Sequence, residues 1–134
     1  MSQQSNKLSP IVNRISSVIL WSRNLEKSVN KYRKLFDVTP EQETAYPQTN
    51  LHIFRLPGGS DVMIDANGMD QIPMPDKASP LFFLPANDID EAAAFIESLG
   101  FTIVYGGIFR SENVSFFNMR DDDFNVITVC QNHK

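Results

Sequence analysis

An internal repeat constrains the fold of this 134-residue chain more than any other feature. The first copy has an apolar run at residues 17–21 and a helix-like run at 25–36, and the second copy has the same pair at 81–84 and 89–99. The copies are offset by 64 residues at the helices and by 63 residues afterwards. A nearly constant offset predicts two copies of one supersecondary unit.

Each copy is predicted to contain one amphipathic helix and several strands. Apolar residues recur at helical spacing and predict one buried stripe on each helix: Leu25, Val29, Tyr32, Leu35 and Phe36, then Ile89, Ala93, Ile96 and Leu99. Ser22 or Asn24 is placed to cap the first helix, and Asp88 to cap the second. The predicted fold class is therefore α+β, with two tandem βαβββ modules.

The strands after each helix predict hairpins. The first hairpin turns at residues 57–60, Pro-Gly-Gly-Ser, which is a strong turn signal. A simple register across that turn places Phe54 opposite Met63 and His52 opposite Asp65. This register puts all four side chains on one face of the sheet, because residues directly opposite each other share a face.

The repeat and the turn signals also predict where the leader, the two modules and their linker begin and end. Residues 1–13 are polar at the start, lack the apolar core of a signal peptide, and are predicted to be a disordered leader. Residues 14–131 are predicted to form one domain, with the first module at 14–66, a proline-containing linker at 67–80 and the second module at 81–131.

Composition narrows the function classes. The net charge of −4 argues against a nucleic-acid partner, since phosphate neutralisation requires clustered Lys and Arg. No apolar run approaches the roughly 20 residues of a membrane span, so we expect no membrane partner. The single cysteine, Cys130, excludes an internal disulfide and favours a reducing compartment. We therefore expect a cytoplasmic protein.

Three segments together resemble the vicinal oxygen chelate superfamily, which includes glyoxalase I, extradiol dioxygenases and bleomycin-resistance proteins. They are the first strand and helix, residues 18–35, the strand-to-helix turn at 86–92, and the last turn and strand at 121–129 (Asp-Asp-Asp-Phe-Asn-Val-Ile-Thr-Val). The last segment is similar to the family pattern Asp-Pro-Asp-Gly-Asn-x-x-Glu. The resemblance covers residues 14–131 and implies that the modules form an incomplete barrel around a small-molecule cavity.

The metal-dependent relatives hold a divalent ion at four sheet positions, and the resemblance carries these onto Ser17, Asp65, Leu81 and Thr128. Of these residues only Asp65 is a usual ligand of a divalent cation. A catalytic ion usually needs three or more nitrogen or oxygen ligands from the protein. The sequence therefore predicts no metal site and no cofactor.

Two further departures from the family pattern concern turns. Phe124 and Asp37 occupy positions where the pattern has glycine, and only glycine adopts a positive φ at little cost. The last turn is therefore predicted to be remodelled. Its three aspartates, residues 121–123, are predicted to form a solvated acidic turn rather than a calcium loop.

Strand alternation from the lost metal positions defines the predicted cavity face. It collects Ser17, Ile19, Trp21, His52, Phe54, Met63, Asp65, Leu81, Phe83 and Thr128, which are the candidate ligand-binding residues, with Cys130 beside them. Trp21 and Phe54 are candidates for stacking on a planar ligand. His52 and Asp65 are the candidate catalytic pair, as a general base with a carboxylate that fixes the imidazole tautomer.

The sequence leaves three functions open. The leading hypothesis is a metal-independent protein that binds an unidentified small molecule, because the repeat is kept while the ligand set is lost. The first alternative is a lyase, isomerase or dioxygenase with a remodelled metal site or the metal-free pair of His52 and Asp65. The second is a non-catalytic interaction module. A homodimer is expected from the resemblance and from the frequency of twofold symmetry.

Overall fold

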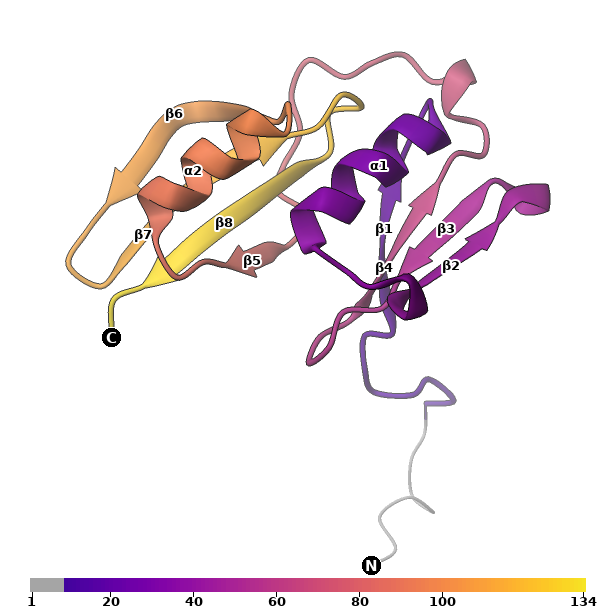
Figure 1. The fold of residues 1–134 in the computed structure, drawn as a ribbon, viewed down its shortest axis with the longest axis horizontal. Coiled ribbons are helices and arrows are strands. Elements are labelled where there is room, and N and C mark those ends of the chain that lie inside the picture. The colour runs from indigo at the N-terminus through magenta and orange to yellow at the C-terminus, as the bar shows by residue number, and fades with distance from the viewer. Residues whose placement is uncertain (1–8) are drawn as a thin grey trace, which may run out of the picture.

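A computed structural model describes residues 9–134, which form two modules side by side (Figure 1). The first module contains β1 (Ser17–Trp21), α1 (Leu25–Phe36), β2 (Glu43–Tyr46), β3 (Leu51–Phe54) and β4 (Asp61–Asp65). The second contains β5 (Phe83–Pro85), α2 (Ile89–Ser98), β6 (Thr102–Arg110), β7 (Val114–Arg120) and β8 (Val126–Asn132). Short 3-10 helices are η2 (Pro40–Gln42), η3 (Pro47–Thr49) and η4 (Met69–Gln71). The first eight residues of the predicted leader lie outside the described part of the chain.

The two sheets have the same topology, which confirms the predicted α+β fold of two tandem βαβββ modules. Their strand orders are β1-β4-β3-β2 and β5-β8-β7-β6. In each sheet the first strand of the module pairs in parallel with the last strand, and the remaining pairs are antiparallel. Both sheets are open at their edges, so the modules do not close into a barrel.

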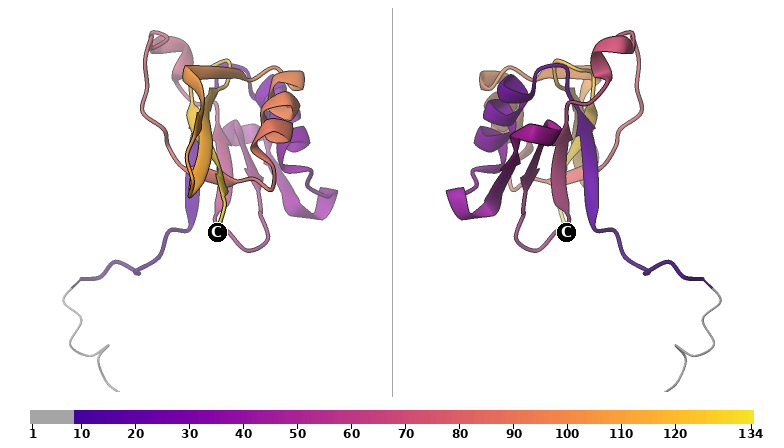
Figure 2. Two further views of the ribbon diagram at one scale, coloured as in Figure 1. Left: turned by 90° about the vertical axis from the view of Figure 1, so that its left-hand side faces the viewer. Right: turned by 90° about the vertical axis from the view of Figure 1, so that its right-hand side faces the viewer.

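Both helices pack on the same side of the sheets (Figure 2). The predicted N-caps form, because Asn24 Oδ1 accepts a hydrogen bond from the Lys27 amide at 3.1 Å and Asp88 Oδ1 accepts one from the Glu91 amide at 2.9 Å. One core runs under both helices and includes the fully buried Tyr32, Phe54, Ile64, Phe117 and Ile127. In the described chain, no helix is long and apolar enough to cross a membrane.

The predicted register of the first hairpin is wrong by one residue. His52 lies opposite Ile64 and Phe54 lies opposite Val62. The strand β3 ends at Phe54, and Leu56 beyond it packs against the core. A slip of one residue moves every side chain of a strand to the other face of its sheet.

Asp37 ends α1 in the left-handed region, with φ 50° and ψ 48°. A β-carbon makes this conformation costly, and the exposed Asp37 side chain has no packing role that offsets the cost. We expect Asp37→Gly to raise the free energy of unfolding by about 0.5–1 kcal/mol, measured by urea denaturation. Asp37→Ala removes the same charge without relieving the backbone. A gain with alanine equal to that with glycine would show that charge, not conformation, is responsible.

Candidate functional site

The face of the sheets opposite the helices is apolar and exposed. It carries Ile19 at 43% exposure, Trp21 at 41%, Leu81 at 52%, Phe83 at 69% and Phe109 at 51%. Large apolar side chains gathered on one face are unusual for the surface of a monomer and indicate a binding surface. We call this surface the open face.

Strand pairing shows which residues of the two modules are equivalent on the open face. Ile19 pairs with Met63 in the first sheet, and Phe83 pairs with Thr128 in the second. Phe83 is the repeat partner of Ile19, so Thr128 corresponds to Met63. The sequence offset had instead matched Thr128 with Asp65. Thr128 Oγ1 donates a hydrogen bond to Asn118 at 2.6 Å. The central level of the open face is therefore apolar except for Thr128 and its cross-strand neighbour Asn118, whose side chains bond to each other.

Asp65 lies at the end of β4, where it pairs with Trp21 of β1. Its carboxylate accepts hydrogen bonds from the Asn67 amide nitrogen at 2.9 Å and from Asn67 Nδ2 at 2.8 Å. Asp65 thus stabilises the turn that follows its own strand. Within residues 9–134 no group of three or more His, Cys, Asp and Glu side chains is placed to hold a metal ion.

His52 lies on the helix side of its sheet, so the predicted pair of His52 with Asp65 does not form. His52 Nε2 is 2.8 Å from Glu43 Oε1, and its ring packs 4.9 Å from that of Phe54. Hydrogen bonds from Arg33 Nε hold the pKa of the Glu43 carboxyl below its usual range, against the opposing effect of burial. The Arg33, Glu43 and His52 side chains tie α1 to β2 and β3.

Phe54 is also misplaced by the predicted register. Its side chain is 0% exposed and packs edge-on against Phe36, with the ring centroids 5.8 Å apart. Phe54 is therefore a core residue and does not lie on the open face. Ser17, Ile19, Trp21, Met63, Leu81 and Phe83 remain candidates for contact with a ligand.

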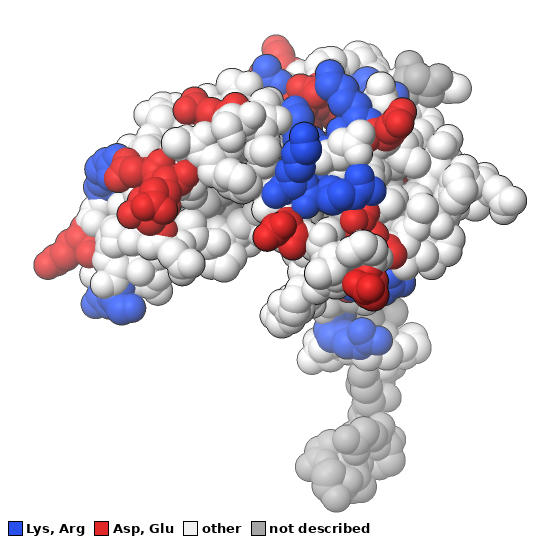
Figure 3. Space-filling model, viewed as in Figure 1, with Lys and Arg blue, Asp and Glu red and all other residues white. Residues whose placement is uncertain are grey.

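The basic side chains of α1 do not form a free patch. Lys27 and Lys31 each lie 3.2 Å from Asp122, and Arg33 pairs with Glu43 at 2.8 Å. Figure 3 shows these blue side chains beside red ones on the helix side of the molecule. These three basic side chains are thus paired with carboxylates, while Lys34 of the same helix is exposed.

The open face is hollowed beside Trp21. A pocket of about 250 Å³ lies between Trp21 of β1, Val126 of β8, Leu81 just before β5, and residues 69–79 of the segment that joins the modules. The charged side chains that line it, Arg23 and Asp123, form an ion pair at 3.3 Å. Ser79 and Asn125 add polar groups, and the rest of the lining is apolar.

Solved structures share this arrangement over nearly their whole length. An enzyme of the glyoxalase/bleomycin resistance protein/dioxygenase family from Burkholderia phytofirmans PsJN aligns with a TM-score of 0.65 at 15% identity, covering 87% of this chain and 97% of that one. This is the vicinal oxygen chelate fold. Lactoylglutathione lyase from Agrobacterium tumefaciens aligns with a TM-score of 0.62 at 17% identity, covering 90% and 95% of the two chains. TioX from Micromonospora sp. ML1 aligns with a TM-score of 0.61 at 16% identity, covering 90% and 99%.

The vicinal oxygen chelate fold is thus shared with these proteins, while their sequences have diverged widely. No model of a protein family matches this chain, and no curated protein matches it in sequence. Identities below a fifth carry no information about substrate, so function has to be argued from the site itself.

The turn at residues 121–125 joins the two halves of this vicinal oxygen chelate fold, and we call it the joint. Asp121 is 3% exposed, and its carboxylate accepts hydrogen bonds from Tyr32 Oη at 2.7 Å, Asn125 Nδ2 at 2.8 Å, and the amides of Asp123 and Asn125, both at 2.9 Å. Burial raises the pKa of the Asp121 carboxyl, and the bonds from Asn125 and Tyr32 oppose that rise. Burial also raises the pKa of the Tyr32 phenol, which keeps it a neutral donor. The prediction of a solvated turn is therefore wrong for Asp121 and Asp123, whereas Asp122 is exposed.

The joint also fixes Trp21. The side-chain amide of Asn125 donates to the Trp21 carbonyl at 2.7 Å and accepts from the Trp21 amide at 3.4 Å. Asn125 thus bonds to both backbone groups of Trp21 at the free edge of β1, as a neighbouring strand would. Phe124 adopts a positive φ of 64°, the conformation that the sequence had reserved for glycine at this position. Its ring lies under the Arg120 guanidinium, 5.1 Å from the ring centroid.

Proposed function

We propose that this protein binds a planar, largely apolar small molecule on its open face without a metal ion. The observation that carries this proposal is the exposure of Ile19, Trp21 and Phe83 on the open face, which adjoins a pocket with a mostly apolar lining. Aromatic side chains bind flat ligands by offset stacking and by removing apolar area from water. The central strand pairs of the open face offer a cation the Thr128 hydroxyl and the Asn118 side-chain amide, both neutral and bonded to each other, which supports binding over metal chemistry.

We further propose that the ligand site is completed by a second copy of the chain. The segment before β1 extends away from the domain and exposes Ile11 at 70% and Ile15 at 73%. Apolar side chains on an extended arm and on the open face together give a homodimer two surfaces to bury. The single cysteine supports a reducing, cytoplasmic location for this dimer.

A thermal-shift screen of uncharged planar polycyclic compounds, beginning with the dye Nile red, tests the binding proposal. A compound at 100 times its dissociation constant is expected to stabilise the protein by about 2.7 kcal/mol. Trp21→Ala is expected to weaken binding at least about tenfold, because stacking and buried area are both lost. The matched control is Phe95→Ala, since Phe95 is 46% exposed on α2, away from the open face.

Three results would count against the proposal. A tightly held stoichiometric divalent ion in the purified protein would favour the enzyme alternative and refute metal independence. Equal effects of Trp21→Ala and Phe95→Ala would remove the open face as the site. A strictly monomeric protein by light scattering, at concentrations where the compound binds, would refute the shared site.

A further inference from the structure

The segment that joins the modules crosses the open face. Residues 69–79, which we call the strap, lie on the side of the sheets away from the helices (Figure 2). Met69, Ile72, Pro73, Pro75 and Ala78 of the strap line the pocket that Trp21 lines from the sheet. A ligand that enters this pocket from the strap side has to displace the strap.

Arg23 holds the first half of the strap. Its Nη2 donates to the Ile72 carbonyl at 3.0 Å, and its Nη1 lies 3.7 Å from Met74 Sδ and 3.3 Å from Asp123 Oδ1. The Arg23 side chain is 22% exposed and is fixed by the joint. This end of the strap is therefore anchored to the rigid part of the fold.

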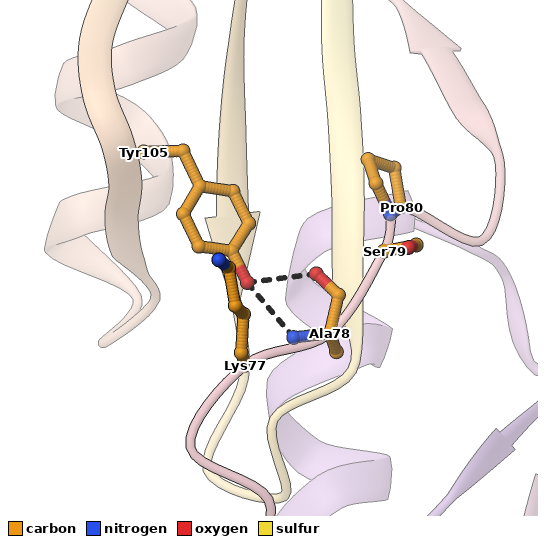
Figure 4. Close-up of a pocket in the computed structure, with 5 residues that line it drawn as sticks. All are labelled: Lys77, Ala78, Ser79, Pro80 and Tyr105. Atoms are coloured by element: carbon orange, nitrogen blue, oxygen red, sulfur yellow. Dashed lines mark hydrogen bonds between the residues drawn. The ribbon is translucent and has the colours of Figure 1, made fainter.

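Tyr105 of β6 holds the second half of the strap (Figure 4). Its hydroxyl donates to the Ala78 carbonyl at 2.7 Å and accepts from the Ala78 amide at 2.9 Å. Both backbone groups of one strap residue are thus bonded by one side chain. The contact is on the surface, where water can replace it, so it can open and close without cost to the core.

The backbone at Tyr105 has a strained conformation, and it lies in a bulge that directs the Tyr105 side chain toward the strap. Tyr105, Gly106 and Gly107 have φ values of 63°, 98° and 82°. The ladder between β6 and β7 shifts between Val104 and Phe109, which leaves extra residues on β6. A positive φ at a bulky residue is strained and persists where the surroundings or function require it. The bulge projects the Tyr105 side chain to the strap.

We propose that the strap is a lid over the pocket beside Trp21 and that Tyr105 is its latch. The ligand class follows from the lining, because the charges of Arg23 and Asp123 neutralise each other and most of the remaining lining residues are aliphatic, aromatic, proline or methionine. Such a slot takes an uncharged planar ring. The ligand part rests on the proposed binding function, whereas the latch is tested without any ligand.

Protease cleavage after Lys77 measures opening of the latch directly, because Lys77 is exposed and lies in the strap next to Ala78. A protease needs several residues in an extended, detached conformation, so cleavage after Lys77 follows the open population of the strap. We expect Tyr105→Phe to raise the rate of Lys-C cleavage at Lys77 about tenfold, from the loss of two surface hydrogen bonds. Tyr46→Phe, at an exposed tyrosine of the edge strand β2, is the matched control.

The lysines of α1 separate opening of the strap from unfolding of the domain. If Tyr105→Phe raises cleavage at Lys77 and leaves cleavage at Lys27, Lys31 and Lys34 unchanged, the latch is supported. An unchanged rate at Lys77, or an equal rise at the lysines of α1, would overturn it. Because Trp21 is the only tryptophan, acrylamide quenching of its fluorescence is expected to increase in Tyr105→Phe alone.

Nile red then tests the lid with its ligand. Association of Nile red with Tyr105→Phe is expected to be about tenfold faster than with the wild type, since opening of the lid precedes entry. If Nile red binds the wild type and both proteins associate with it equally fast, the strap is not a lid. If Nile red and the other planar compounds fail to bind while Lys77 cleavage rises, the proposed ligand fails and the latch stands.

Discussion

Asp121→Ala is expected to lower the free energy of unfolding by about 4 kcal/mol. The carboxylate is 3% exposed and accepts four hydrogen bonds, from the Tyr32 hydroxyl, the Asn125 side chain and two backbone amides. Alanine leaves these buried donors without partners, and each unsatisfied donor costs about 1–3 kcal/mol before water enters the space. Urea denaturation followed by far-UV circular dichroism measures the loss.

The adjacent aspartate is a control within the same turn. Asp122 is 46% exposed and makes ion pairs with Lys27 and Lys31 at 3.2 Å. Surface pairs contribute about 0–1 kcal/mol each, so Asp122→Ala, which removes two of them, is expected to cost about 2 kcal/mol or less. Equal losses in the two variants would mean that the joint is held by charge rather than by buried hydrogen bonds.

The sequence predicted those parts of the fold that local chemistry determines. The helix stripes, the caps at Asn24 and Asp88 and the repeated strand order are periodic or local signals, and the structure confirms them. The backbone conformations of Asp37 and Phe124 were harder to predict, because nothing local favours a positive φ there. Both residues keep the conformation of a glycine because the surrounding fold requires it.

The joint could not be predicted from local signals. Tyr32 and Asp121 are 89 residues apart, and Trp21 and Asn125 are 104 apart. Three consecutive aspartates ordinarily indicate a solvated turn, and only the packing of one module against the other buries two of them. The available signal was the similarity of this turn to the family pattern. That similarity put Asn125 directly after the turn but did not indicate which residues it bonds to.

The candidate site residues on β1 could be predicted from the sequence, whereas those on β3 could not. Residues of β1 were placed correctly on the open face, because alternation along a single strand needs no register. The residues of β3 depended on the turn at 55–60, and one residue of error moved His52 and Phe54 to the wrong face. This error predicted a catalytic pair of His52 and Asp65, whereas the fold places these two side chains on opposite faces of the sheet.

Phe54→Ala tests that correction, because a core residue and a ligand-binding residue respond differently to truncation. Phe54 is 0% exposed and packs on Phe36 and His52. Its replacement leaves a cavity and is expected to cost about 3–5 kcal/mol of stability. Phe83→Ala is the counterpart on the open face, where the side chain is 69% exposed. It is expected to cost less than about 1 kcal/mol.

Binding of the planar probe is expected to reverse that order. Phe83→Ala removes apolar surface from the open face and weakens binding, whereas Phe54→Ala, studied well below its melting temperature, leaves the site residues in place. Denaturation curves and Nile red titrations on the same two proteins measure both effects. If Phe54→Ala keeps full stability and loses the probe, the hairpin has the register first predicted, and the face that carries His52 has to be reconsidered as the site.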